Sequence, residues 1–112
     1  EVPFVIKDLR CVGRPIDVSF NGTLRTEQEP AAQALLAADM GVLSATTAFG
    51  KTVIGAYLIG QRKVNTLILV QSSALLEQWK SSLEQFLNML IGLTQQTTTS
   101  CKCPIYGTTA VR

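Results

Sequence analysis

The sequence predicts an α/β fold, in which parallel strands and covering helices form part of a three-layer architecture. Two short apolar runs, 41–45 and 66–70, have the composition of strands buried in a parallel sheet. Residues 51–61 and 73–87 follow these runs and carry apolar side chains at helical spacing. This order joins two parallel strands by a right-handed crossover. Because complete domains of this class have wider sheets, we expect an incomplete sheet, marginal stability and self-association through open edges.

Composition limits the chain to one small globular unit, since it has 112 residues of which 46% are hydrophobic. The net charge of +2 is no argument for nucleic acid by itself. The absence of histidine excludes His-based catalytic and zinc sites. The odd cysteine count (Cys11, Cys101, Cys103) favours free thiols over half a metal site at the last two. With no signal-peptide pattern and no apolar run of about 18 residues, a soluble cytoplasmic protein is expected.

Two elements are predicted ahead of residue 40. Alternating apolar residues make 16–20 a half-buried strand, which ends at a turn in Asn21 and Gly22. Thr26 and Glu29 have capping-box spacing for a helix that runs to Ala38. Pro30 removes a hydrogen bond if it lies past the first turn, so this helix either starts late or is bent.

The two later helices have clear boundaries. In 51–61, one face carries Val53, Ile54, Tyr57 and Leu58, and Arg62 and Lys63 suit its negative end. Ser72 or Ser73 can cap the helix after 66–70. The apolar stripe of that helix is Leu75, Leu76, Trp79, Leu83, Phe86 and Leu87.

A change of character after residue 87 divides the chain. Glu84 is the last acidic residue, threonines crowd the remainder, and no strand or helix period survives there. We expect an N-terminal strand region at 1–23, a globular α/β unit at 24–91 and a disordered Thr-rich tail at 92–112. One hypothesis is that this tail is not native to the fold, as a frameshift or truncation would produce.

The most informative window is A-T-T-A-F-G-K-T at 45–52, which lies between a predicted strand and a predicted helix. Loop N–H groups and the free N–H groups of a helix start can point into one hollow and bind phosphates. Gly50 lets the backbone pass close to the phosphates because it has no side chain. Lys51 supplies positive charge, and Thr52 offers a hydroxyl to Mg²⁺. The alternative is a surface turn with a helix cap, which the flanking elements disfavour. The residues expected to bind the phosphates of ATP are Thr47, Ala48, Phe49, Gly50, Lys51 and Thr52.

This loop resembles the Walker A motif of superfamily 2 helicases, A-x-T-G-x-G-K-T. The sequence matches that form at Ala45, Thr47, Gly50, Lys51 and Thr52. It departs at Thr46, which is often Pro, and at Ala48, which is usually Gly. Ala48 keeps its N–H donor but resists a positive φ.

Two further windows are similar to the helicases of the type III restriction and excision-repair group. L-R-T-E-Q at 24–28 resembles a segment whose Arg and Gln lie near the adenine, here Arg25 and Gln28. Their alternative role is a solvated first turn of a helix. Residues 67–79 resemble the next motif, which touches the nucleic-acid backbone where a strand ends. Gln71, Ser72 and Ser73 occupy that place, and an ordinary helix cap is the alternative.

The resemblance covers about residues 20–87 and implies a partial RecA-like domain that binds ATP and Mg²⁺. It implies the N-terminal part of a DNA or RNA helicase or translocase, which is an ATP hydrolase. Hydrolysis in that family needs an Asp-Glu pair and a second motor domain. No Asp follows Asp39, and Glu77 and Glu84 read as surface charges of a helix. We therefore expect this chain alone to be inactive.

Two other functions are considered. A non-catalytic nucleotide-binding module would act with a partner that supplies the missing acid. A small P-loop kinase or GTPase is disfavoured, because those families place the loop near the N-terminus, whereas about forty residues precede it here.

Overall fold

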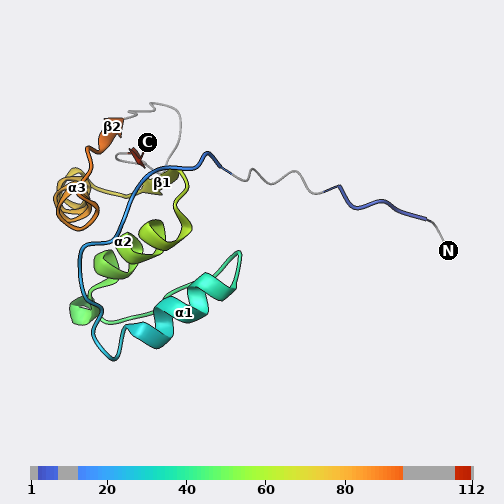
Figure 1. The fold of residues 1–112 in the computed structure, drawn as a ribbon, viewed down its shortest axis with the longest axis horizontal. Helices are drawn as coiled ribbons and strands as arrows, with labels where there is room; N and C mark the ends of the chain where they lie inside the picture. The colour runs from blue at the N-terminus through green and yellow to red at the C-terminus, as the bar shows by residue number, and fades with distance from the viewer. Residues whose placement is uncertain (1–2, 8–12, 95–107, 112) are drawn as a thin grey trace.

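The computed structural model describes residues 3–7, 13–94 and 108–111 (Figure 1). Its helices are α1 (Glu29–Ala37), α2 (Lys51–Arg62) and α3 (Ser73–Leu87), with a short 3₁₀ helix, η1 (Thr47–Phe49), directly before α2. The strands are β1 (Thr66–Leu69), β2 (Gly92–Thr94) and β3 (Thr108–Val111). None of the helices in these residues has the length and apolar character that a bilayer crossing requires.

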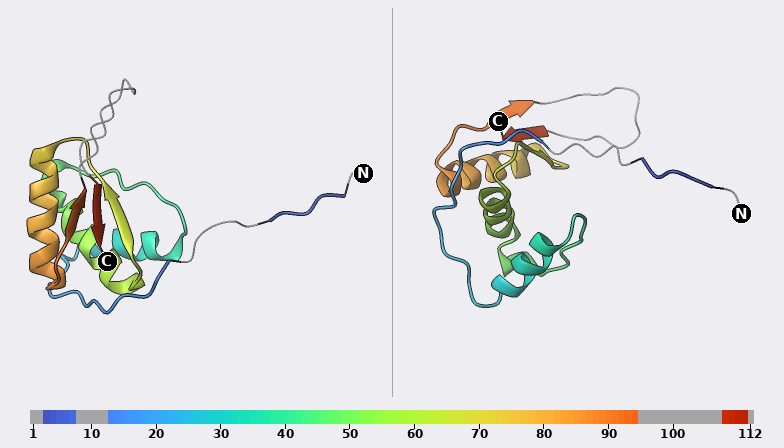
Figure 2. Two further views of the ribbon diagram at one scale, coloured as in Figure 1. Left: turned by 90° about the horizontal axis from the view of Figure 1, so that it is seen from above. Right: turned by 45° about the vertical axis from the view of Figure 1, so that its right-hand side comes forward.

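The strands form one sheet in the order β1-β3-β2, with both pairings antiparallel. In this register Leu67 lies opposite Ala110, and Leu93 lies opposite Thr109. Figure 2 shows the helices on one side of this sheet. Leu67 and Leu69 point away from the helices and are each 59% exposed. The sheet is therefore covered on one face, as antiparallel sheets can be and parallel sheets rarely are.

The predicted pair of parallel strands is wrong for the described residues. Residues 41–45 form no strand, and Val42 is 94% exposed. Residues 66–69 do form β1, but its partner is β3, from the far end of the chain. An apolar run has to find a hydrogen-bonding neighbour before it becomes a buried strand, and sequence periodicity does not reveal that neighbour. The described residues do contain both helices and strands, as an α/β protein does. They do not form the predicted three-layer arrangement.

The core lies between α2 and α3, where the predicted stripe of α3 is confirmed. Leu76, Leu83 and Leu87 are buried along α3. Helix α2 buries Ile54, Ala56, Ile59 and Gly60, of which Ala56 and Ile59 pack with Leu83 and Leu87 of α3. The main buried cluster is Val18, Ala56, Ile59, Leu83, Leu87 and Ile91.

The segment 16–20 alternates buried and exposed side chains as predicted but is not a strand. Its backbone pairs only at the start, through an isolated antiparallel bridge between Pro15 and Val64. Beyond the bridge, its apolar side chains reach helices rather than another strand. Phe20 meets Tyr57 edge-on at 5.4 Å and stacks on Phe86 at 5.7 Å between ring centroids. The alternation of apolar and polar residues therefore indicates only that one side of the segment is buried. An extended segment that packs on helices has this pattern as well as a strand does.

Helix α1 starts late, which is one of the two alternatives that Pro30 left open. Pro30 lies in the first turn, where its missing N–H costs no helical hydrogen bond. The capping box is wrong, because the helix begins at Glu29 after Gln28, with no side-chain cap bond. The backbone N–H groups of Gln28 and Glu29 donate instead to the Arg25 carbonyl, at 2.9 and 3.2 Å.

Arg62 ties α1 to α2. It lies in the last turn of α2 as predicted. Its guanidinium, however, donates to the carbonyls of Ala38 and Leu35 at the end of α1, at 2.8 and 3.3 Å. The charge therefore stabilises the negative end of a neighbouring helix as well as its own.

The Thr-rich stretch 92–112 contains β2 and β3, which the sequence did not suggest. Residues 95–107 and 112 lie outside the described residues, as do all three cysteines. The predicted disorder of this stretch therefore does not hold at 92–94 and 108–111, and stays a prediction elsewhere. The division at residues 23 and 91 also stays a prediction.

Candidate phosphate-binding loop

The loop before α2 folds as a tight turn. Thr46 is extended, with φ −62° and ψ 162°, and η1 follows it. Gly50 then adopts a left-handed conformation, with φ 82° and ψ 47°, and α2 begins at Lys51. A side chain at that φ is unfavourable, which is the physical reason for glycine at this place. Ala48 lies within η1 and is not among the residues with positive φ, so its departure from the usual Gly strains nothing here.

Lys51 folds back over the start of the loop. Its Nζ donates to the Ala45 carbonyl at 2.8 Å and to the Thr46 carbonyl at 3.2 Å. An ammonium group has three N–H donors, so these bonds hold its charge at the loop and leave one donor for a ligand. The side chain is exposed, and an incoming anion can therefore reach it.

The first backbone N–H groups of α2 lie directly at the end of this loop. Val53 and Ile54 donate to the Gly50 carbonyl at 3.1 and 3.3 Å. The N–H groups of Lys51 and Thr52 come before these and have no helical carbonyl to meet. Thr52 is half-buried at the second position of α2. The donor set fits a polyphosphate with its Mg²⁺, because backbone amides, an ammonium group and a hydroxyl, which are the groups that bind phosphate and Mg²⁺, lie together at this loop.

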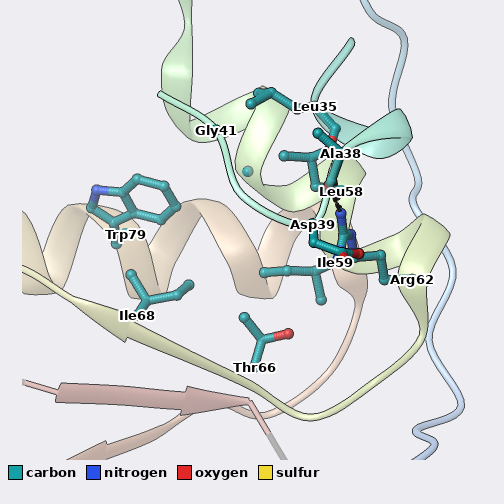
Figure 3. Close-up of a pocket in the computed structure, with 11 residues that line it drawn as sticks. Leu35, Ala38, Asp39, Gly41, Leu58, Ile59, Arg62, Thr66, Ile68 and Trp79 are labelled. Atoms are coloured by element: carbon teal, nitrogen blue, oxygen red, sulfur yellow. Dashed lines mark hydrogen bonds between the residues drawn. The ribbon is translucent and has the colours of Figure 1, made fainter. Parts of the chain in front are cut away.

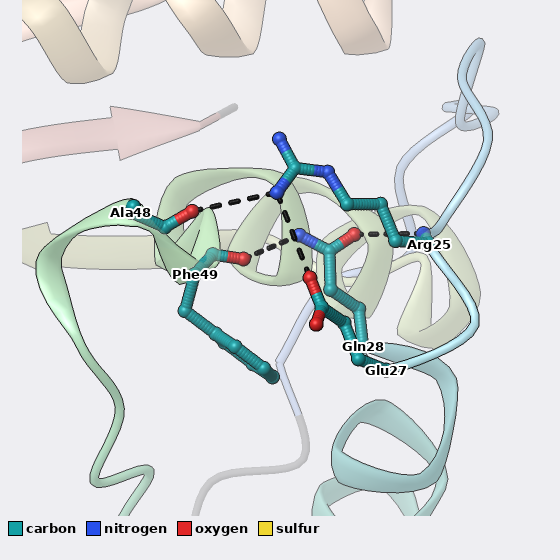
Figure 4. A network of polar contacts seen from close by, with 5 residues as sticks. All are labelled: Arg25, Glu27, Gln28, Ala48 and Phe49. Atoms are coloured by element: carbon teal, nitrogen blue, oxygen red, sulfur yellow. Dashed lines mark hydrogen bonds and ion pairs between the residues drawn. The ribbon is translucent and has the colours of Figure 1, made fainter.

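Arg25 and Gln28 meet this loop from the start of α1 (Figure 4). Gln28 Nε2 donates to the Phe49 carbonyl at 2.6 Å, and its Oε1 accepts from the Arg25 N–H at 2.9 Å. Arg25 Nη1 donates to the Ala48 carbonyl at 3.4 Å. The same atom lies 3.7 Å from Glu27 Oε1, in an exposed ion pair that sequence reasoning missed.

Gln28 is 2% exposed and packs against Gly50. A Cβ built on Gly50 would lie 2.5 Å from Gln28 Nε2. The structure therefore brings the predicted adenine-binding pair together with the predicted phosphate-binding loop. The solvated first turn, the alternative for these residues, does not describe Gln28.

The third predicted group, Gln71 to Ser73, lies at the start of another helix, α3. Ser72 is its N-cap, and the hydroxyl accepts from the Leu75 N–H at 3.2 Å. This is the helix-cap role that the sequence left open. Gln71 and Ser73 are exposed on either side of it.

The acidic residues after the loop both lie in α3, where Glu77 is exposed and Glu84 is half-buried. Among the described residues, no group of three or more His, Cys, Asp or Glu side chains is placed to hold a metal ion.

A pocket of about 310 Å³ lies along α2, toward its C-terminal end and away from the loop (Figure 3). Leu58 and Ile59 of α2, Ile68 of β1 and the Trp79 ring form its apolar walls. Arg62 also lines it, but this guanidinium already donates to the end of α1. Sequence reasoning placed Trp79 in the apolar stripe of its helix and did not foresee the pocket, which is mostly apolar and unsuited to phosphates.

A glycine-lysine-threonine loop that turns into a helix, braced by an Arg and a Gln from upstream, is the arrangement of a helicase-like ATP-binding domain. The chain belongs to the family of the type III restriction enzyme res subunit, whose model matches residues 21–105. The predicted resemblance is thereby confirmed, and the match continues into the Thr-rich stretch. No curated protein and no solved structure matches the chain.

Proposed function

We propose that residues 45–52 bind the triphosphate of ATP, and that this chain supplies the nucleotide-binding part of a helicase or translocase. The observation that carries the proposal is the left-handed Gly50 immediately before Lys51, with the Lys51 ammonium held over the loop. Family membership gives the helicase-like ATP-binding class, and the loop geometry supports the residues.

Each part of the loop has a distinct role in this proposal. The N–H groups of Gly50, Lys51 and Thr52 bind phosphate oxygens. The Lys51 ammonium exchanges its bonds to two neutral carbonyls for charge-assisted bonds to the β and γ phosphates. Thr52 is the protein ligand of Mg²⁺, which neutralises phosphate charge when bound. Arg25, whose guanidinium is exposed, stays the candidate contact for the adenine.

Nucleic acid is the proposed second ligand of the helicase, and DNA and RNA both fit. Ser72 already uses its hydroxyl as a helix cap, so Gln71 and Ser73 are the side chains that offer donors to phosphate there. We also propose self-association through the open sheet, and a cytoplasmic location on the basis of the cysteine count.

Hydrolysis is not assigned to these residues. The acids that follow the loop, Glu77 and Glu84, belong to α3, and no Asp follows Asp39. In the helicases that this chain resembles, an Asp-Glu pair beside the γ phosphate binds Mg²⁺ and orients the attacking water. Binding without turnover also supports the second candidate, a nucleotide-binding module whose partner supplies the acid. Steady ATP turnover by the 112-residue chain would show that hydrolysis needs no partner, and would exclude this second candidate.

The test of ATP binding compares two lysine variants by calorimetry with Mg-ATP. Lys51→Ala is expected to weaken binding by roughly 10- to 100-fold, because it removes a charged hydrogen-bond donor. Lys63→Ala removes the same charge just beyond α2, at an exposed position, and is expected to leave the affinity unchanged. Equal affinities for Lys51→Ala and the unaltered chain would overturn the proposal.

A further inference from the structure

We infer that residues 3–7 of one copy add a strand to the free edge of β1 in a second copy, and that Phe4 and Ile6 enter the apolar pocket along α2. The inference rests on the self-association proposed above and deepens it, because it names the segment that associates and the site that receives it. It does not depend on ATP binding, which concerns the loop at the start of α2.

Residues 3–7 form an apolar segment that leads away from the helices and the sheet (Figure 1). Phe4, Val5 and Ile6 are 81%, 94% and 82% exposed. Three consecutive large apolar side chains in water favour burial against another surface. Their composition suits a strand, and Pro3, which has no N–H, is tolerated at the first position of an edge strand.

Strand β1 offers this segment an open edge. In the order β1-β3-β2 it is an end strand, so among the described strands only β3 pairs with it. The N-terminal segment of the same copy runs beside the residues just before β1, where the Asn65 N–H donates to the Arg14 carbonyl at 2.9 Å. Gly13, with φ 81°, ends the extended run there, and no described residue of that segment continues it along β1. The backbone groups of this edge are therefore open to a strand from another copy.

The pocket lies against the helix-facing side of β1 (Figure 3). Thr66 and Ile68 of β1 line it, together with the Trp79 ring of α3. Its volume is about 310 Å³. An apolar cavity of about 150 Å³ holds a benzene molecule, so this pocket has room for two large apolar side chains. Because protein interiors leave few such spaces empty, an apolar occupant is favoured.

The alternation of side chains along a strand matches the segment to the pocket. In an added strand, Phe4 and Ile6 share one face and Val5 takes the other. With Phe4 and Ile6 directed toward the helices, both enter the pocket, while Val5 joins Leu67 and Leu69 on the uncovered face. Because each copy carries both the segment and the edge, a two-fold dimer makes this contact twice.

Sedimentation velocity over a range of protein concentrations tests the segment. Phe4→Asp is expected to weaken association by roughly tenfold or more, because it places a charge in an apolar pocket. Leu90→Asp is the matched control, since it makes the same change at a side chain that is 90% exposed and lies outside both the segment and β1. Association of Phe4→Asp as strong as that of the unaltered chain would overturn the inference.

Trp79 reports on the pocket, because it is the only tryptophan of the chain. Its fluorescence emission is expected to move to longer wavelength on dilution, as the segment leaves and water enters. In Phe4→Asp, the long-wavelength emission is expected at every concentration, and a peptide of residues 1–7 is expected to reverse it. Emission that does not change with concentration in the unaltered chain, or no response to the peptide, would contradict filling by a second copy.

The results also separate this inference from the proposals on which it rests. If Leu67→Lys, Leu69→Lys disrupts association and Phe4→Asp does not, the sheet associates without the segment and only this inference fails. An unaltered chain that is monomeric at about 100 µM overturns both the inference and the self-association. ATP binding is decided independently, because the calorimetric comparison of Lys51→Ala with Lys63→Ala requires no association.

Discussion

Gly50 carries the backbone through a conformation that other residues adopt only at a cost. Its φ of 82° turns the chain from η1 into α2, and the amide of Gln28 fills the space where a side chain would lie. Two separate requirements, one of backbone geometry and one of packing, thus act on one residue. The position directly before Lys51 is where the loop tolerates substitution least.

Gly50→Ala is expected to lower the free energy of unfolding by about 1–2 kcal/mol, because the new methyl group meets a positive φ and a filled site together. Gly41→Ala is the control, since Gly41 has no positive φ and the atom nearest its added Cβ is the flexible end of Leu35. Urea titration followed by circular dichroism measures both. Similar losses in the two variants would contradict the account of Gly50.

At the scale of elements, α2 and α3 form the pair on which the rest depends. Leu83 is fully buried between them, and Phe20 lays the N-terminal segment across the same pair through Tyr57 and Phe86. Gly60 permits that approach, since a Cβ there would lie 3.0 Å from the Phe20 backbone nitrogen. The α2–α3 pair therefore holds α2 in place, and the loop leads directly into α2.

Leu83→Ala is expected to cost about 2–5 kcal/mol of stability, because it opens a cavity in the main cluster of buried apolar side chains. Leu90→Ala deletes the same atoms where the side chain is 90% exposed, and should change stability by less than about 0.5 kcal/mol. Thermal unfolding followed at 222 nm compares them. A small effect at Leu83 would show that the helix pair is not the core.

At the scale of the whole molecule, the sheet that is covered on one face favours self-association. The helices cover one face, and Leu67 and Leu69 stand on the other. The strand β1 also forms an edge of the sheet. An uncovered apolar face next to a strand edge favours association with another sheet.

The double variant Leu67→Lys, Leu69→Lys is expected to shift the chain toward monomer in sedimentation velocity, because it adds charge to the uncovered face. Ser81→Lys, Gln85→Lys adds the same charge at exposed positions of α3 and serves as control. If the unaltered chain is monomeric at about 100 µM, a concentration at which weak self-association is visible, the prediction is wrong.

The sequence alone located α2, α3 and a serine cap at Ser72 or Ser73, because helical period, caps and a glycine before a basic residue are local signals. For the same reason the candidate loop was found at 45–52 before any coordinates. Tertiary structure decided what local signals do not contain, namely which partner each extended segment and each long polar side chain meets. In the structure β1 pairs with β3, and 41–45 forms no strand. Arg62 donates to the end of α1, and Gln28 is buried against Gly50. Such choices depend on contacts between residues distant in sequence, whose free energies are set by the whole packed chain.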